Sequence, residues 1–325
     1  MAKPKVAFYW NASCGGCEEA VVDLAEDILK VVDAVEFVLW PVAMDFKRED
    51  VEALEDGEIA VAFVNGAVRT SEQEDWARLL RKKAGLVVAF GSCAHLGGIP
   101  GLANFSNREG VFEASYDYLP TVDNPKGTRP QLETKVPEGT LELPEFYDTV
   151  YALDQVVDVD YYLPGCAPPA NLILDAVTAI LAGELPPKGT VLAPTKSLCD
   201  ECKRNETKPD KIEISELKRP HETMMDPEKC FLAEGVICMG PATRAGCGER
   251  CINANMPCRG CFGPTDEVRD QSAKFLSALA SVLDVRDPEE MEKLSETIPD
   301  VTGLFAMYSL PVTLLKRRKL DDQAS

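Results

Sequence analysis

Cysteine constrains this chain more than any other residue type, because eight of its twelve cysteines fall between residues 199 and 261. The segment opens with the Cys-x-x-Cys pair of LCDECKR and closes with the pair of CRGC. Eight thiols divide into two sets of four, and four-thiolate sites are typical of zinc and of iron–sulfur clusters. The sequence therefore predicts metal or cluster ligation by Cys199, Cys202, Cys230, Cys238, Cys247, Cys251, Cys258 and Cys261.

A disulfide framework is the alternative explanation for so many cysteines, but it requires an oxidising compartment and a secretion signal. The opening residues, MAKPKVAFYW, contain neither a long apolar segment nor twin arginines. No run of about 18 apolar residues, the length that spans a membrane, occurs in the chain. We therefore expect a cytoplasmic protein without a membrane anchor. The formal net charge of −20 argues against nucleic-acid binding, which requires clustered Lys and Arg.

Strands and helices alternate in the first part of the chain. Apolar runs of strand length occupy residues 6–10, 35–39, 59–64, 86–90 and 161–163. Apolar residues recur at helical spacing over residues 18–32, 72–83 and 171–181. The alternation predicts an α/β domain over residues 1–185, built on a doubly wound parallel sheet with helices on both faces.

The four remaining cysteines follow the strands of this predicted sheet. Cys14 and Cys17 come after the first strand, Cys93 after the fourth and Cys166 after the fifth. Because ligands of such sheets bind beyond the carboxyl ends of the strands, we expect these thiols to form a third four-cysteine site. Cys93 and Cys166 would otherwise be small buried residues. The neighbouring glycines favour the site, since they let backbone N–H groups approach a bulky cofactor.

The rest of the chain has weaker patterns. Residues 104–160 show no sustained period, and we interpret them as surface that packs on a partner. Residues 186–285 form a predicted cysteine-rich domain that metal sites hold together, rather than a large apolar core. Within it, residues 266–283 have the spacing of an amphipathic helix. Residues 286–325 are expected to be a C-terminal tail, whose cationic run at 316–319 is either solvated or in contact with a partner subunit.

Six stretches carry a resemblance to a known family, and they occur in that family's order. They are SCGGCEEAVVDL, GSCAHLGG, PGCAPPANLILDAV, LCDECKR, KCFLAEGVICMGPATRAGC and CINANMPCRGCFGP. The chain resembles the small, iron–sulfur subunit of cytoplasmic nickel–iron hydrogenases, of the F420-non-reducing, methyl-viologen-reducing or related electron-bifurcating type. The resemblance implies a flavodoxin-like first domain followed by a small irregular cluster domain. The cluster-carrying subunit of respiratory NADH dehydrogenase shares only the first-domain pattern.

The resemblance also implies three [4Fe–4S] clusters. The proximal cluster would be bound by Cys14, Cys17, Cys93 and Cys166. The medial cluster would be bound by Cys247, Cys251, Cys258 and Cys261. The distal cluster would be bound by Cys199, Cys202, Cys230 and Cys238. Such a subunit passes electrons one at a time between the nickel–iron centre of a partner large subunit and a further electron-transfer subunit, which is a flavoprotein, ferredoxin-like or linked to heterodisulfide reductase.

Two acidic residues follow Cys17. Glu19 matches a glutamate that the family keeps beside the proximal cluster, and the resemblance implies a role for it as a proton relay. We expect Glu18 instead to face solvent at the start of a helix, where a carboxylate favours the helix dipole. His95 and His221, the two histidines, are expected to be structural, although His95 is near enough in sequence to Cys93 to tune a cluster by hydrogen bonding.

Two other functions remain open from the sequence. The chain would be an electron-transfer subunit of another oxidoreductase without hydrogen chemistry, or a zinc-stabilised interaction protein. Zinc accounts for Cys-x-x-Cys pairs but not for four thiolates gathered at the ends of parallel strands.

Overall fold

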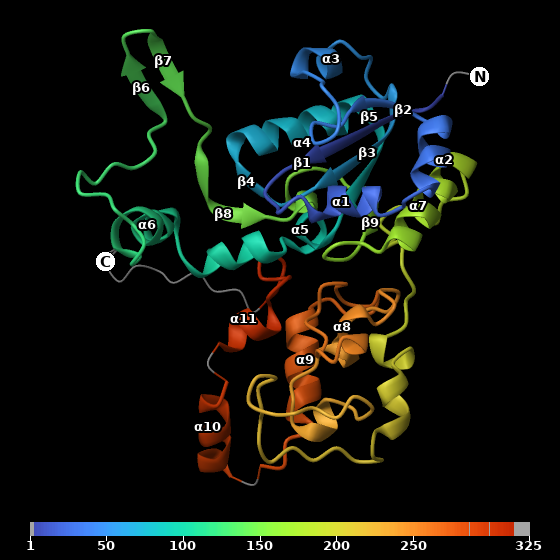
Figure 1. The fold of residues 1–325 in the computed structure, drawn as a ribbon, viewed down its shortest axis with the longest axis vertical. Coiled ribbons are helices and arrows are strands. Elements are labelled where there is room, and N and C mark those ends of the chain that lie inside the picture. The colour runs from blue at the N-terminus through green and yellow to red at the C-terminus, as the bar shows by residue number, and fades with distance from the viewer. Residues whose placement is uncertain (1–2, 286, 299, 315–325) are drawn as a thin grey trace.

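The computed structural model describes residues 3–285, 287–298 and 300–314. Its first half is an α/β unit built on a five-stranded parallel sheet with the strand order β2-β1-β3-β5-β9, which is the flavodoxin-like doubly wound order. This confirms the predicted fold class. The strands are β1 (Lys5–Trp10), β2 (Glu36–Leu39), β3 (Ile59–Asn65), β5 (Ala84–Phe90) and β9 (Tyr161–Leu163). Figure 1 shows this unit above a smaller, largely irregular half that contains the cysteine-rich segment.

Helices cover both faces of the sheet, as the alternation predicts. On one face lie α1 (Gly16–Val22), α2 (Asp27–Ala34) and α7 (Ala170–Ala182), whose apolar residues form one core with Phe8, Phe63 and Phe90 of the strands. On the other face lie α3 (Arg48–Glu52), α4 (Ser71–Lys83) and α5 (Ser92–Leu96), which pack on Ala62 and Val64. Successive strand residues alternate between the two cores because side chains of a strand point to opposite faces.

The expected single helix over residues 18–32 is wrong, because the chain forms α1 and α2 with a break between them. Ala25, in the break, has a φ of 50°, a left-handed conformation that cannot continue a right-handed helix. The consequence is local. The apolar side chains Val21, Leu24 and Val31 still reach the same core.

Residues 99–155 form a surface insertion rather than a further layer of the sheet. Its elements are η1 (Ile99–Phe105), α6 (Arg108–Glu113), η2 (Ala114–Tyr118), β6 (Glu133–Val136), β7 (Gly139–Glu142), β8 (Phe146–Tyr151) and η3 (Leu153–Gln155). The β6–β7 hairpin projects away from the sheet (Figure 1), and β8 pairs with β4 (Val68–Thr70). That these residues pack on a partner stays a prediction.

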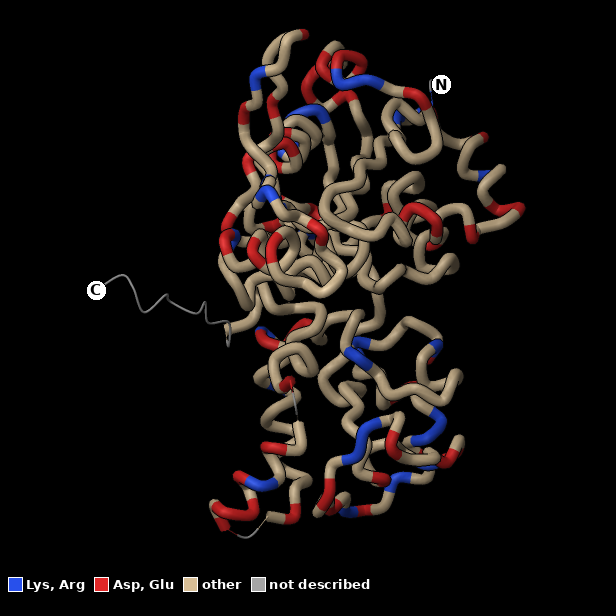
Figure 2. The backbone as a smooth tube through the Cα atoms, turned by 60° about the vertical axis from the view of Figure 1, so that its left-hand side comes forward, with Lys and Arg blue, Asp and Glu red and all other residues tan. Residues whose placement is uncertain are grey.

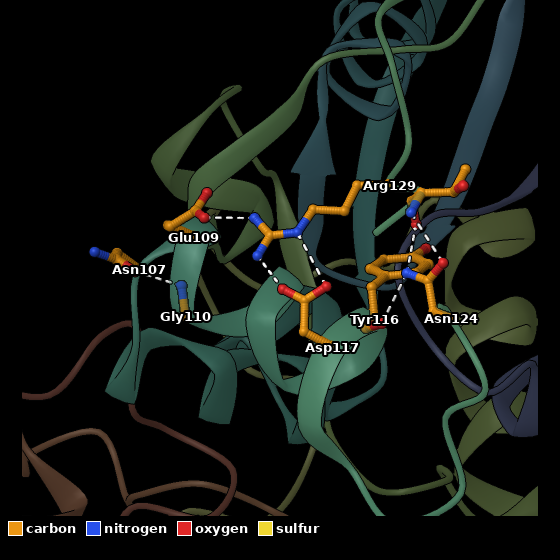
Figure 3. Close-up of polar contacts among 8 residues, drawn as sticks. Asn107, Glu109, Gly110, Tyr116, Asp117, Asn124 and Arg129 are labelled. Atoms are coloured by element: carbon orange, nitrogen blue, oxygen red, sulfur yellow. Dashed lines mark hydrogen bonds and ion pairs between the residues drawn. The ribbon is translucent and has the colours of Figure 1, made fainter. Parts of the chain in front are cut away.

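Side-chain contacts, not secondary structure, order the middle of this insertion. Arg129 donates to the carboxylates of Glu109 and Asp117 (Figure 3). Asn124 donates from Nδ2 to the carbonyl oxygen of Tyr116 at 2.9 Å and to that of Thr128 at 2.9 Å. Such contacts leave no periodic signal, which is why the sequence pattern in this region is uninformative.

The second half of the structure consists of short turns with a small core. Its elements are η4 (Leu198–Asp200), η5 (Lys203–Thr207), η6 (Leu232–Glu234), η7 (Gly240–Ala242), α8 (Arg250–Asn253), α9 (Gln271–Ala280), α10 (Pro288–Glu296) and α11 (Val301–Phe305). Phe231, Phe275 and Phe305 are at the centre of its apolar cluster. The helix predicted over 266–283 is shorter, because Asp270 accepts a hydrogen bond from the Ala273 N–H and so caps the N-terminus of α9.

The connection between the halves stays attached to the sheet beyond the proposed boundary at residue 185. Val191 pairs with Tyr162 of β9, and the Leu192 N–H donates to the Tyr162 carbonyl at 2.8 Å. The division into domains 1–185, 186–285 and 286–325 therefore stays a proposal. The run 316–319 lies outside the described residues.

Charge is distributed unevenly between the two halves. Residues 1–185 contain 14 Lys and Arg against 31 Asp and Glu, whereas residues 186–285 contain 14 against 15. Figure 2 shows basic residues at frequent intervals along the cysteine-rich half. The acidity of the chain is thus a property of the α/β half. Among the helices of residues 3–285, 287–298 and 300–314, none has the length and hydropathy needed to span a bilayer.

Asp160 is predicted to be a stabilising residue of the α/β half. Its buried carboxylate pairs with Arg81 at 2.6 Å, accepts from the Val87 N–H at 2.8 Å and contacts Lys188. Burial alone would raise the pKa of Asp160, but these three groups together lower it. Asp160→Asn should lower the free energy of unfolding by about 2 kcal/mol at pH 7, measured by denaturant titration.

The sign of the pH dependence follows from the lowered pKa. The stabilisation is present above the unfolded carboxyl pKa of about 4 and is lost as the pH falls through the folded value. Wild type and Asp160→Asn should therefore converge in acid. Asp158→Asn, which changes an exposed carboxylate on the same segment, should stay within about 0.5 kcal/mol of wild type. Equal stability of the two variants at pH 7 would contradict the assignment.

Candidate functional site

The strand register brings the first four cysteines to one edge of the sheet. The last residues of four neighbouring strands pair in sequence, since Trp10 pairs with Asn65, Asn65 with Phe90 and Phe90 with Leu163. The chain leaves three of these strands directly into cysteine-bearing loops or helices, which carry Cys14, Cys17, Cys93 and Cys166. Burial raises the pKa of the Cys17 thiol, and the thiols of the other three raise it further. The structure thus brings together the four residues that the sequence assigns to the proximal site.

Two glycines leave room for these sulfurs. A Cβ on Gly91 would lie 2.3 Å from Sγ of Cys17, and a Cβ on Gly98 would lie 2.5 Å from Sγ of Cys93. Both glycines have positive φ, at 86° and 56°, which side chains disfavour. The backbone N–H of Ile99 donates to the Cys93 thiol. In the loop after β5, the backbone therefore lies close to the sulfurs of Cys17 and Cys93, and one backbone N–H group points at the Cys93 sulfur.

Of the two glutamates after Cys17, the structure buries the one expected to face solvent. Glu18 is buried, with 1% of its surface exposed, and accepts hydrogen bonds from Trp40 Nε1 and from Asn65 Nδ2 at 3.1 Å. Burial raises the pKa of Glu18, and the two hydrogen bonds partly oppose that rise. Glu19 is exposed on the other side of the turn. The expectation that Glu18 faces solvent is therefore wrong.

Glu18 belongs to a network that holds the cysteine loop. Asn65 Oδ1 accepts from the hydroxyl of Ser13 at 2.6 Å, and that hydroxyl accepts from the Gly15 N–H at 3.3 Å. The network connects the ends of β1 and β3 with α1 and with Trp40, which follows β2. Sequence reasoning missed it, because nothing in the spacing of Glu18, Trp40 and Asn65 shows that they meet.

The cysteines assigned to the distal site surround a cavity of about 280 Å³ in the second half. Burial raises the pKa of Cys199 to about 12, and the thiols of Cys238, Cys230 and Cys202 contribute to that rise. Backbone N–H groups of Arg204 and Asn205 donate to the Cys202 thiol. A Cβ on Gly240 would lie 3.1 Å from Sγ of Cys199. This set has both the space and the donors that a cluster requires.

Arg204, two residues after Cys202, is a further residue that the sequence patterns did not single out. Its buried guanidinium donates to the carbonyl oxygens of Asp226 at 2.9 Å and Lys229 at 3.0 Å, and to Asn255 Oδ1 at 2.8 Å. It also lies 4.1 Å from the ring centroid of Phe231. One side chain thus connects the backbone just before Cys230 with the loop that carries Asn255. The signal available in the sequence was the arginine of LCDECKR, which is Arg204 itself, close to the Cys-x-x-Cys pair.

The cysteines assigned to the medial site lie between the other two sets. Burial raises the pKa of Cys261 to about 12, with contributions from the thiols of Cys166, Cys247 and Cys251. Cys258 lies beside Cys261, and burial raises its pKa as well. The backbone N–H groups of Glu249 and Arg250 donate to the thiol of Cys247.

Two backbone N–H groups connect the three sets. The N–H of Cys258 in the medial set donates to Sγ of Cys238 in the distal set at 3.3 Å. The N–H of Cys166 in the proximal set donates to the thiol of Cys261 in the medial set. These two contacts link the three cysteine sets in the order proximal, medial, distal.

Neither histidine is placed as a ligand of a cysteine set. His95 is buried against Tyr162, with ring centroids 4.7 Å apart, and its Nδ1 atom has no hydrogen-bond partner in the described structure. Burial and the nearby charge of Arg244 lower the pKa of His95 to about 3, so the ring is neutral. His221 is exposed, and its Nε2 atom lies 3.7 Å from Oε1 of Glu222. That His95 tunes a cluster stays a prediction.

The chemistry of the thiols fits an iron–sulfur cluster. Nine of the twelve cysteines have a raised pKa, and burial is the main cause in each. Thiols that lie close together and are partly withdrawn from water resist ionisation unless a cationic centre compensates their charge. An iron–sulfur core supplies that compensation, and the N–H groups directed at the sulfurs supply the hydrogen bonds.

Comparisons with known proteins agree with this geometry. Residues 14–180 match the family model described as NADH ubiquinone oxidoreductase, 20 Kd subunit. The chain is 39% identical to the iron–sulfur subunit of the F420-non-reducing hydrogenase of Archaeoglobus profundus, over 97% of this chain and 98% of that protein. It is 34% identical to the corresponding subunit of the F420-non-reducing hydrogenase of Methanothermobacter thermautotrophicus, over 96% of each.

Among solved structures, the chain is similar to one from the recombinant [NiFeSe] hydrogenase of Desulfovibrio vulgaris Hildenborough, with a TM-score of 0.52 and 18% identity. The match covers 81% of this chain and 94% of that chain. At this identity the likeness concerns the fold, which is that of a hydrogenase small subunit. From the near full-length relatives, the chain belongs to the family of the iron–sulfur subunits of F420-non-reducing hydrogenases, the small electron-transfer subunits of [NiFe] hydrogenase complexes.

Proposed function

We propose that this chain carries electrons one at a time between the nickel–iron centre of a partner large subunit and an external redox partner, through three [4Fe–4S] clusters. The observation that supports this most is the connected series of three four-cysteine sets, joined by the N–H of Cys166 and the N–H of Cys258. When bound, such clusters accept and release single electrons.

Each cysteine set has a defined role in this proposal. The proximal cluster would be held by Cys14, Cys17, Cys93 and Cys166. The medial cluster would be held by Cys247, Cys251, Cys258 and Cys261. The distal cluster would be held by Cys199, Cys202, Cys230 and Cys238. The backbone N–H groups around them would stabilise negative charge on the sulfurs, and the surrounding apolar residues would limit access of water.

The large subunit would cover the face that carries the proximal set. Cys14 and Cys166 are exposed in this chain, and Trp10, beside the same loop, is 42% exposed. Cluster ligands that border an exposed aromatic side chain favour a protein interface there. Glu19 is exposed near this loop, where a partner would bury it, and we propose it as a proton relay across that interface.

The distal set would face the external redox partner, which is a flavoprotein, a ferredoxin-like subunit or one linked to heterodisulfide reductase. Its cavity reaches the surface and is lined by residues of both charges, among them Lys208 and Asp210. The cysteine-rich half is nearly neutral, so this face need not select a strongly charged partner. We place the complex in the cytoplasm.

Metal analysis tests the proposed clusters. The complex, purified without oxygen, should contain about twelve irons and twelve acid-labile sulfides per copy of this chain, together with nickel. Cys230→Ala should lose about four irons, because it removes one distal ligand. His221→Ala, an exposed residue of the same half, should keep all of them. Zinc without sulfide would contradict the proposal.

Cys14→Ala tests the proximal role directly. Hydrogen oxidation with an artificial acceptor should fall at least 100-fold, because the electron path from the large subunit is interrupted at its first step. The complex should still assemble, as judged by gel filtration, since Cys14 is exposed and supports no core contact. Wild-type turnover would remove Cys14 from the path.

Glu19→Gln tests the proton relay. Hydrogen oxidation should fall about 10-fold while iron content stays unchanged, because the amide cannot exchange a proton. Glu18→Gln is the matched comparison on the adjacent residue. It should weaken the hydrogen bonds from Trp40 and Asn65 and so lower the melting temperature of the complex. Full turnover of Glu19→Gln would leave Glu19 without this role.

A further inference from the structure

A second cavity, of about 420 Å³, lies in the cysteine-rich half of the structure. The loop of residues 217–221 forms one part of its wall, and Thr297, Ile298 and Asp300 together with residues of α11 form another. No cysteine is among the described residues that line it, so it is not one of the cluster sites. Its volume is within the range of pockets that hold small molecules, roughly 300 to 1,000 Å³.

The charged residues around this cavity are mostly basic. Lys218, Arg219 and Arg259 line it, against one acidic residue, Asp300. The Asp300 carboxylate already accepts the hydrogen bond that caps the N-terminus of α11, and Glu216, which lies 3.6 Å from Lys218, is outside the lining. The chain as a whole has a formal net charge of −20, so this local excess of positive charge stands against its composition. It favours an anionic ligand.

Arg259 shows most directly that an acceptor is needed. Its side chain is partly buried, and its buried Nε atom has no hydrogen-bond partner in the described structure. Among the residues that the structure describes, neither Arg259 nor Arg219 forms an ion pair. Arg204 and Arg244, the buried arginines of the same half, are by contrast each bound to several acceptors. Withdrawing a guanidinium from water without an acceptor costs free energy, which a bound anion would offset.

The rest of the wall is apolar and selects the kind of anion. Leu217, Ile237 and Leu304 line the cavity and pack against the apolar cluster of this half. An inorganic anion would gain nothing from such walls, whereas an organic anion would bury its apolar body against them. The charges would also attract an acidic segment of a partner subunit, but a cavity of this size with apolar walls favours a small molecule.

We propose that this cavity binds a small organic anion, whose carboxylate or phosphate head pairs with Arg259. The apolar body of the ligand would lie against Leu217, Ile237 and Leu304. Arg219, which is exposed, would strengthen the attraction at the mouth of the cavity. The inference goes beyond the proposed function and does not depend on the cluster assignment.

2-Naphthoate is the probe that tests this inference, because it joins an apolar ring system to one carboxylate. Calorimetric titration of the intact complex without oxygen should show one saturable site per copy of this chain. The uncharged analogue 2-naphthamide should bind about 10-fold more weakly. Arg259→Gln should weaken 2-naphthoate binding about 10-fold. Lys274→Gln, an exposed residue of α9 outside the lining, should leave it unchanged.

Two further variants keep the test independent of the medial cysteines, since Arg259 stands between Cys258 and Cys261 in the chain. Met256 lines the cavity and is 48% exposed, so Met256→Trp should fill the space and abolish binding without disturbing a core. Arg219→Gln should weaken binding about 3-fold, as expected for an exposed charge. Both variants should keep the iron content of wild type.

Three results would overturn the inference. Absence of saturable 2-naphthoate binding would mean that the cavity is closed or filled by a partner subunit in the complex. Equal affinity for 2-naphthoate and 2-naphthamide would remove the preference for an anion. Unchanged binding in both Met256→Trp and Arg219→Gln would place the probe elsewhere. Each of these results concerns binding alone, so the iron and sulfide content still tests the proposed function separately.

Discussion

The parallel register of the sheet is the constraint on which the rest of the structure depends. Because β1, β3, β5 and β9 end side by side, loops that are far apart in sequence must leave the sheet at one edge. That edge carries the proximal cysteines, and Cys166 there contacts Cys261 of the second half. The positions of the medial and distal sets therefore depend on the sheet, although neither set belongs to it.

The second half has a different physical requirement, because few of its backbone groups form the hydrogen bonds of helices or sheets. Buried carbonyl groups still need donors. Two buried arginines supply them. Arg204 serves the loops around the distal set. Arg244 donates to the carbonyl oxygens of Ala193 and Pro194, where the chain enters this half, and to that of Pro264. The irregular segment thus has its own hydrogen-bonding framework and a small apolar core beside the thiols.

Buried polar groups next to the sulfurs are the other shared feature of the three sets. Peptide N–H groups contact Cys93, Cys202, Cys238, Cys247 and Cys261. Glu18, by contrast, contributes nothing directly to a sulfur but closes a network that holds the loop of Cys14 and Cys17. Preorganised dipoles of this kind reduce the rearrangement that a change of charge would otherwise require.

The sequence by itself determined the sheet, its strand order class and the family, because apolar periodicity and cysteine context are local signals. It also led to the expectation that Cys14, Cys17, Cys93 and Cys166 follow strands that end at one edge of the sheet, and the strand register agrees with that placement. It did not reveal the break at Ala25. It also did not reveal which of Glu18 and Glu19 is buried, because the side of a short helix that faces the core depends on what packs against it. Only the tertiary structure placed Asn65 and Trp40 around Glu18 and Arg204 around the distal loops. These contacts join residues far apart in the chain, and no spacing in the sequence encodes them.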